Sequence, residues 1–178
     1  MKKIYQLLLL LGLAFGTNAH ADLLIEPLVG YSFGRYTTTT PSEDDETING
    51  TSYGGRLGYS NLGLQLGVDY LNSNVNVKDE NDDLKATEWA GFVGFKFPIL
   101  FRVYAGYVFS GSGELGNLDF SKGTGMKAGV GFTGLPFINI NLEYRKIAYD
   151  EVKVGSVELS DDYGYNAYMI SLSLPFTL

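Results

Sequence analysis

The chain has 178 residues, no cysteine and a formal net charge of −7. This length suits one domain with a substantial core, while the lack of cysteine excludes disulfides and thiolate metal sites, and the acidic balance argues against nucleic-acid binding. The 23 glycines, the 14% of aromatic residues and the absence of long amphipathic helical patterns indicate an all-β protein.

The first segment has the pattern of a secretory signal peptide. Lys2 and Lys3 supply a charged start, residues 7–15 are apolar, and Ala19-His20-Ala21 is a small-x-small cleavage site. The apolar stretch is shorter than the roughly 20 residues that a membrane-spanning helix needs. We therefore assign residues 1–21 to a signal peptide and residues 22–178 to one mature domain.

After Asp22 the chain repeats one pattern, in which apolar residues occupy alternate positions and each run ends at a break. Long polar breaks alternate with short turns, which is typical of an up-and-down antiparallel meander of eight strands. The expected strands are 23–36, 51–60, 62–71, 86–97, 101–110, 124–133, 137–149 and 163–178; the long breaks are 37–50, 72–85, 111–123 and 150–162; the short turns are Ser60-Asn61, Pro98–Leu100 and Gly134–Pro136.

The residues opposite each apolar face decide between a water-soluble barrel and a membrane barrel. In the third run, Leu64, Leu66 and Val68 alternate with Gln65 and Gly67. Small residues with occasional charges suit the narrow inside of a small barrel, and they would cover a water-facing sheet poorly. We therefore expect the apolar face to contact lipid and the small polar face to line the interior.

With these features the chain resembles the small eight-stranded outer-membrane barrels of Gram-negative bacteria, of the OmpA/OmpX-like type. The last run, "YMISLSLPFTL", alternates from Tyr168 to Leu178, with Phe176 two positions before the end. The resemblance implies an eight-stranded antiparallel transmembrane β-barrel in the outer membrane, in contact with its lipid and lipopolysaccharide. It also implies that the C-terminal strand is recognised by the barrel-assembly machinery, although that strand usually ends in an aromatic residue.

Ionisable residues on the inward face are the most informative chemistry of the sequence. Buried charges are costly unless they are paired, so we expect two ionic layers with Arg56 between them. These layers predict a structural plug, with a charge-lined or gated path as the alternative. The expected interior set is Glu26, Arg56, Asp69, Glu88, Lys96, Arg102, Lys127, Glu143 and Arg145.

Two cations have the outward position and need a separate explanation. Arg35 and Lys146 follow their apolar runs at the end with the long loops. A cation facing lipid costs about 2–4 kcal/mol at the midplane and little near the interface. We therefore expect both at the rim, where they either extend toward water or contact lipopolysaccharide phosphates.

Prolines lie near the ends of the first and last strands, which must pair to close the barrel. Pro27 and Pro175 each lack a ladder donor. A weak seam that opens sideways is one interpretation, and prolines at ordinary strand ends are the other.

The long breaks are acidic, which indicates a solvated surface or a site of contact with an extracellular partner. Residues 79–90 begin like a calcium loop, but Leu84 and Ala90 occupy the positions that require Gly and Glu. An EF-hand is therefore excluded and no defined metal site is expected, while loose binding of calcium at the acidic surface is the alternative to a plain solvated surface. The acids are Glu43, Asp44, Asp45, Glu46, Asp79, Glu80, Asp82, Asp83, Asp150, Glu151, Glu158, Asp161 and Asp162.

No catalytic constellation emerges from the chain, and no cofactor is expected. The only histidine is His20, inside the expected signal peptide, which removes histidine-dependent hydrolysis. We expect a non-enzymatic outer-membrane protein with a structural or surface-interaction role through its loops. The alternative is a narrow channel or a transporter of one small ligand.

Overall fold

The structure is a computed structural model that describes residues 22–38, 46–77, 83–154, 157–159 and 163–178. The predicted signal peptide, 1–21, lies outside the described residues, as do many of the acids predicted in the loops. No helix in the described part of the chain is long and apolar enough to cross a membrane.

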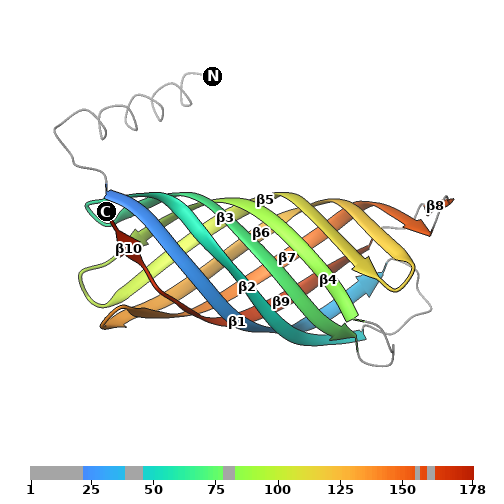
Figure 1. The fold of residues 1–178 in the computed structure, drawn as a ribbon, viewed down its shortest axis with the longest axis horizontal. Coiled ribbons are helices and arrows are strands. Elements are labelled where there is room, and N and C mark those ends of the chain that lie inside the picture. Colours follow the sequence, from blue (N-terminus) through green and yellow to red (C-terminus); the bar gives the residue numbers. More distant parts are fainter. Residues whose placement is uncertain (1–21, 39–45, 78–82, 155–156, 160–162) are drawn as a thin grey trace, which may run out of the picture.

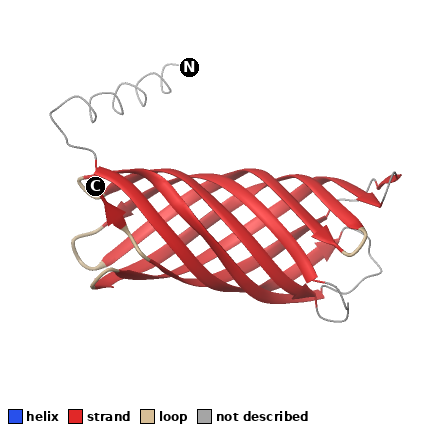
Figure 2. Ribbon diagram, viewed as in Figure 1, coloured by secondary structure: helices blue, strands red, loops and turns tan. Residues whose placement is uncertain are grey.

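The described residues form a closed antiparallel barrel with an up-and-down order of strands (Figures 1 and 2). The eighth strand of the wall is interrupted into β9 and β10, and the short β8 extends the pairing of β7. This arrangement confirms the predicted fold class. The strands are β1 (Asp22–Thr38), β2 (Glu46–Asn61), β3 (Leu64–Val77), β4 (Asp83–Lys96), β5 (Phe101–Leu115), β6 (Leu118–Leu135), β7 (Ile138–Val154), β8 (Val157–Leu159), β9 (Tyr163–Ser173) and β10 (Phe176–Thr177).

The first and last strands pair with each other and close the barrel. The ladder between β1 and β9 begins at Leu28↔Ser173, and the ladder between β1 and β10 includes Leu24↔Thr177. Closure leaves no open sheet edge in the wall. The start of β1, the C-terminus and the short turns lie at one end, here the short-turn end, and the opposite end is the long-loop end (Figure 1).

The two faces of the wall alternate as the sequence predicts. On β7, Ile140, Leu142 and Tyr144 are exposed, while Asn141 and Glu143 are buried. Exposed apolar side chains continue around the outside over all eight wall strands. A continuous apolar outer surface around a polar interior is the arrangement of a membrane-spanning barrel.

At the long-loop end the strands extend further than predicted. Most of the expected loop 111–123 is strand, because β5 and β6 meet at a tight turn, Gly116-Asn117, where Gly116 has φ +56°. Gly111-Ser112-Gly113, at the start of that expected loop, lies within β5 next to register shifts. In this section polar residues face outward and apolar residues face inward, which is the reverse of the lipid-facing section. Because the outward residues are polar, the sequence of these strands resembles that of a polar loop.

Two of the short turns lie about two residues later than predicted. β2 continues to Asn61, and the turn to β3 is Leu62-Gly63. Leu62 has φ +48° and Gly63 has φ +88°, the signs of a type I′ hairpin turn. Likewise, β6 ends at Leu135, so the next turn is 136–137.

Candidate functional site

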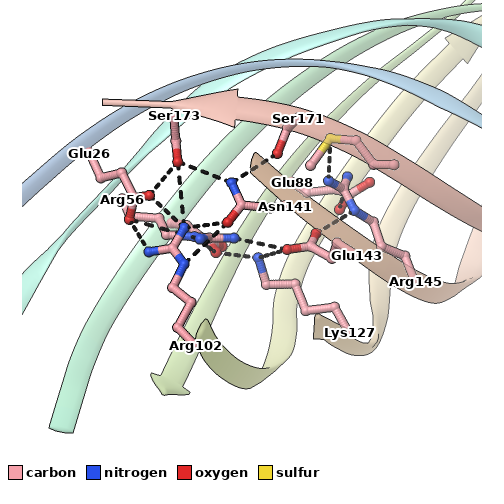
Figure 3. Close-up of polar contacts among 12 residues, drawn as sticks. Glu26, Arg56, Glu88, Arg102, Lys127, Asn141, Glu143, Arg145, Ser171 and Ser173 are labelled. Carbon is pink, nitrogen blue, oxygen red and sulfur yellow. Dashed lines mark hydrogen bonds and ion pairs between the residues drawn. The ribbon is translucent and has the colours of Figure 1, made fainter. Parts of the chain in front are cut away.

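The barrel interior carries a connected network of charges, because inward positions of seven wall strands project into one narrow space (Figure 3). Eight of the nine predicted interior charges are buried there: Glu26, Arg56, Asp69, Glu88, Arg102, Lys127, Glu143 and Arg145. The ninth, Lys96, is exposed at the last position of β4, and the structure does not bring it to the others. Without Lys96 the interior set holds four acids and four bases, which balance.

Near the short-turn end, Glu26 and Arg102 form a bidentate pair. Arg102 Nη1 donates to Glu26 Oε2 at 2.7 Å, and Nη2 donates to Oε1. Asn141 Oδ1 accepts from the Nε and Nη2 groups of Arg102 at 3.1 and 2.7 Å. The Ser173 hydroxyl also donates to Glu26. Arg102 Nη2 lies 3.5 Å from the same hydroxyl, so this buried cation has partners from β1, β7 and β9.

Arg56 connects this pair to the rest of the network. Its Nη2 donates to Glu143 Oε2 at 3.0 Å, while Nε lies 3.5 Å from Asp69 Oδ2 and Nη1 lies 3.9 Å from Glu26 Oε2. The guanidinium also lies 4.1 Å from the centre of the Tyr104 ring, a cation–π contact. The two expected ionic layers thus form one network, and Arg56 is the link between them.

Toward the long-loop end, Glu143 is shared by several cations. Arg145 Nε donates to Glu143 Oε1 at 2.7 Å, and Lys127 Nζ lies 3.7 Å from Glu143 Oε2 while it also pairs with Asp69. Arg145 Nη1 reaches Glu88 Oε2 at 3.4 Å. Each carboxylate therefore faces at least one cation, as buried charges require.

Above the network, toward the long-loop end, the interior is apolar. Buried side chains from β2 to β7 and from β9 form a cluster there, and this cluster was not predicted. Between this cluster and Arg145 the structure leaves a cavity of about 10 Å³, which is at most the space of one water molecule. The cluster contains Ile48, Val75, Leu84, Ala90, Val108, Leu115, Phe120, Ile147, Tyr149, Val152, Tyr165 and Ala167.

Sequence reasoning missed the neutral partners of the charges. Tyr104, Asn141 and Ser173 all have inward positions on strands that were correctly predicted, so the alternation could have found them. A search restricted to ionisable residues overlooks amides and hydroxyls. A further neutral feature is a chain of hydroxyl contacts of 2.8 Å each from Ser32 through Ser52 to Ser73 across β1, β2 and β3.

The two predicted rim cations are on the outer surface. Arg35 and Lys146 are exposed, and both pair in register with Asn166 on β9. The structure therefore brings together two cations that are far apart in the sequence.

The described residues contain no group of three or more His, Cys, Asp or Glu side chains arranged to hold a metal ion. The carboxylates of the interior instead accept from arginine, lysine, serine and tyrosine. The arrangement therefore neutralises charge and fills space.

No protein-family model matches the chain, and no curated protein matches it. Among solved structures, Neisserial surface protein A (NspA) is 18% identical, covers 86% of this chain and 97% of its own, and has a TM-score of 0.54. Ail, the attachment invasion locus protein of Yersinia pestis, is 14% identical, covers 88% of this chain and 99% of its own, and has a TM-score of 0.56. These similarities show a shared fold, the small eight-stranded outer-membrane barrel, and confirm the predicted type of fold.

Proposed function

We propose that this protein is a closed, non-enzymatic barrel of the Gram-negative outer membrane with a structural or surface-interaction role. The apolar outer surface and the shared fold support the membrane location, and the signal-peptide pattern of residues 1–21 supports export. The alternating face from Tyr168 to Leu178, which is exposed to the last residue, supports recognition of the final strand by the barrel-assembly machinery.

The closed interior is the observation that carries the proposal. Side chains fill an eight-stranded barrel almost completely, and here a neutral ionic network lies below an apolar cluster. An ion on this path would have to separate Arg56 from Glu143 and then cross the cluster around Phe120. Both steps argue against the alternatives of a narrow channel and a small-ligand transporter.

The acidic long-loop end favours a cationic partner on the cell surface. The loop sequences around Glu43–Glu46 and Asp79–Asp83 are rich in carboxylates. Ail has been solved in complex with the heparin analogue sucrose octasulfate, a polyanion. Because like charges repel, we propose that this chain prefers a basic protein segment to a sulfated polysaccharide.

Conductance in planar lipid bilayers tests the closed state. We expect no stable single-channel steps from the wild-type protein. Arg56→Gln and Arg145→Gln remove cations from the network, and Lys96→Gln is the matched control because Lys96 is exposed. Stable wild-type steps whose size changes with Arg56→Gln or Arg145→Gln, and not with Lys96→Gln, would overturn the proposal.

A further inference from the structure

Two cations and an amide form one row on the outer surface where β1, β9 and β7 lie side by side. Asn166 on β9 pairs in register with Arg35 on one side and with Lys146 on the other. Neighbouring strands lie about 4.8 Å apart, so the two cations start from backbone positions about 10 Å apart. Their long side chains can therefore approach one anion above Asn166.

An aromatic row lies next to the cation row, on the side toward the short-turn end. Phe33 and Tyr168 are stacked with ring centres 5.9 Å apart, and Tyr144 lies 5.1 Å from Tyr168. The Tyr144 hydroxyl donates to Asn166 Oδ1 at 3.3 Å. Tyrosine at this level is typical of the interface between the lipid chains and the headgroups, which places the cations at headgroup level.

A groove of about 750 Å³ begins at Lys146 and crosses the lipid-facing surface of β6, β5 and β4 to Leu66 on β3. It is hollow because Gly91, Ala105 and Ala128 present little or no side chain between larger neighbours. Its lining is almost entirely apolar, and its volume is in the range of small-molecule sites.

The groove descends into the apolar surface. On the outer face of β7, Tyr144 is followed directly by a polar residue, Lys146. On the outer face of β3, both Val68 and Tyr70 lie between Leu66 and the first polar residue. One end of the groove is therefore beside a cation at headgroup level, and the other end is deeper in the lipid layer.

We infer that this surface binds an anionic phospholipid, whose phosphate charge is not balanced by a cationic headgroup, with the phosphate between Arg35 and Lys146 and one acyl chain in the groove. Charge complementarity selects the headgroup, because no carboxylate among the described residues pairs with Lys146. The apolar lining of the groove favours an acyl chain. A second copy of the barrel would fill the groove equally well but offers its own apolar surface, and not an anion, to Lys146.

Trp89 allows a direct test because it is the only tryptophan and is exposed on the outer face of β4, two positions from Gly91. The protein is placed in phosphatidylcholine vesicles to which a brominated lipid is added, either brominated phosphatidic acid or brominated phosphatidylcholine. The bromine atoms on the acyl chains quench tryptophan fluorescence. We expect brominated phosphatidic acid to quench Trp89 more strongly than brominated phosphatidylcholine at the same mole fraction.

The variants distinguish a specific lipid site at Lys146 from nonspecific attraction of anionic lipid to any cation on the protein surface. Lys146→Gln should lower the relative association constant of phosphatidic acid about fivefold, and Lys146→Arg should retain it. Lys85→Gln is the matched control, since Lys85 is exposed on the same face of β4 as Trp89 but outside the groove. Ala128→Leu, which fills the groove, should reduce quenching by phosphatidic acid.

Three outcomes would overturn the inference. The first is equal quenching by the two lipids in the wild-type protein, and the second is an equal effect of Lys85→Gln and Lys146→Gln. The third is wild-type quenching that falls as protein density rises while Ala128→Leu is insensitive to density, which would assign the groove to a second copy. None of these outcomes bears on conductance, so the closed-barrel proposal is tested separately.

Discussion

Arg56 Nη2 donates to Glu143 Oε2 at 3.0 Å inside the barrel, although the two residues are 87 positions apart on β2 and β7. Both side chains are buried. This contact connects the Glu26–Arg102 pair of the short-turn end to the Arg145–Glu88 pair of the long-loop end. The charges of the interior therefore behave as one unit.

Replacing Arg56 by Gln should destabilise the barrel strongly. The change leaves Glu143 and Asp69 with fewer cations, and removing one partner of a buried ion pair costs about 3–5 kcal/mol. Urea-induced unfolding in lipid vesicles measures this loss in the free energy of unfolding.

The double variant with Glu143→Gln provides the control for this effect. Substitutions within one network do not have additive effects on the free energy of unfolding. We therefore expect a coupling energy of about 0.5–3 kcal/mol between the two positions. Lys96→Gln should change stability by less than about 0.5 kcal/mol, because Lys96 is exposed. Additive losses for the double variant would contradict the central role of this contact.

Glu26→Gln should weaken the seam between the first and last strands. Pro27 and Pro175 interrupt the backbone ladder there, and the remaining contacts include the Leu174 amide, which donates to Pro27 O at 3.0 Å. Glu26 strengthens the same place by accepting from Ser173 and Arg102. Loss of hydrogen bonds to a charged group should accelerate amide exchange of Leu174 about 10- to 100-fold.

Hydrogen exchange followed by NMR measures this effect, and amides between β3 and β4 serve as the internal reference. If Leu174 exchanges at the same rate in the variant and the wild-type protein, the interior network does not support the seam.

Leu62→Asn should stabilise the turn between β2 and β3. Leu62 is 92% exposed and has φ +48°, a conformation that costs an ordinary residue about 1–2 kcal/mol and that Asn adopts more readily. Leu62→Ala removes the same apolar side chain without this preference. Thermal unfolding should therefore show Leu62→Asn to be more stable than Leu62→Ala by about 1 kcal/mol, and equal stability would argue against strain in the turn.

Glu151 gives a pH dependence outside the membrane-spanning section, since it lies five positions beyond Lys146 on β7. A hydrogen bond from Lys122 lowers the pKa of the Glu151 carboxyl below its ordinary value, and the Ser121 hydroxyl adds a contact of 3.2 Å. Because the folded pKa is depressed, the contribution to stability is present above the unfolded pKa and is lost as the pH falls through the folded pKa.

Carboxyl NMR titration of Glu151 checks this expectation. Lys122→Gln should raise the pKa toward its ordinary value, and added salt should do the same in part, because the pair is near the surface. An unchanged titration in Lys122→Gln would show that Lys122 does not hold the carboxylate.

The sequence predicted the lipid-facing part of the fold well, because a membrane barrel imposes strict alternation there. Leu142 and Glu143 could be assigned to opposite faces from their positions alone. The same rule failed for Lys96, which has the inward position but lies at the end of β4, where a long side chain reaches water.

The rest depended on information that alternation does not contain. The cluster around Phe120 lies in strands whose polar outward residues resemble a loop, and only strand pairing reveals that they continue. Arg35 and Lys146 are brought together at Asn166 by the register across three strands and by barrel closure. The sequence of a single strand predicts neither of these.

The interior charges also have a consequence for assembly. If β2 slipped by one residue, Arg56 would face the lipid, at a cost of about 2–4 kcal/mol near the midplane. A slip of two residues would keep Arg56 inside but move it about 7 Å along the strand, away from Glu143. Barrels with misaligned strands would thus contain charged side chains without a partner of opposite charge. The network therefore favours, during assembly, the strand register in which every interior charge is neutralised.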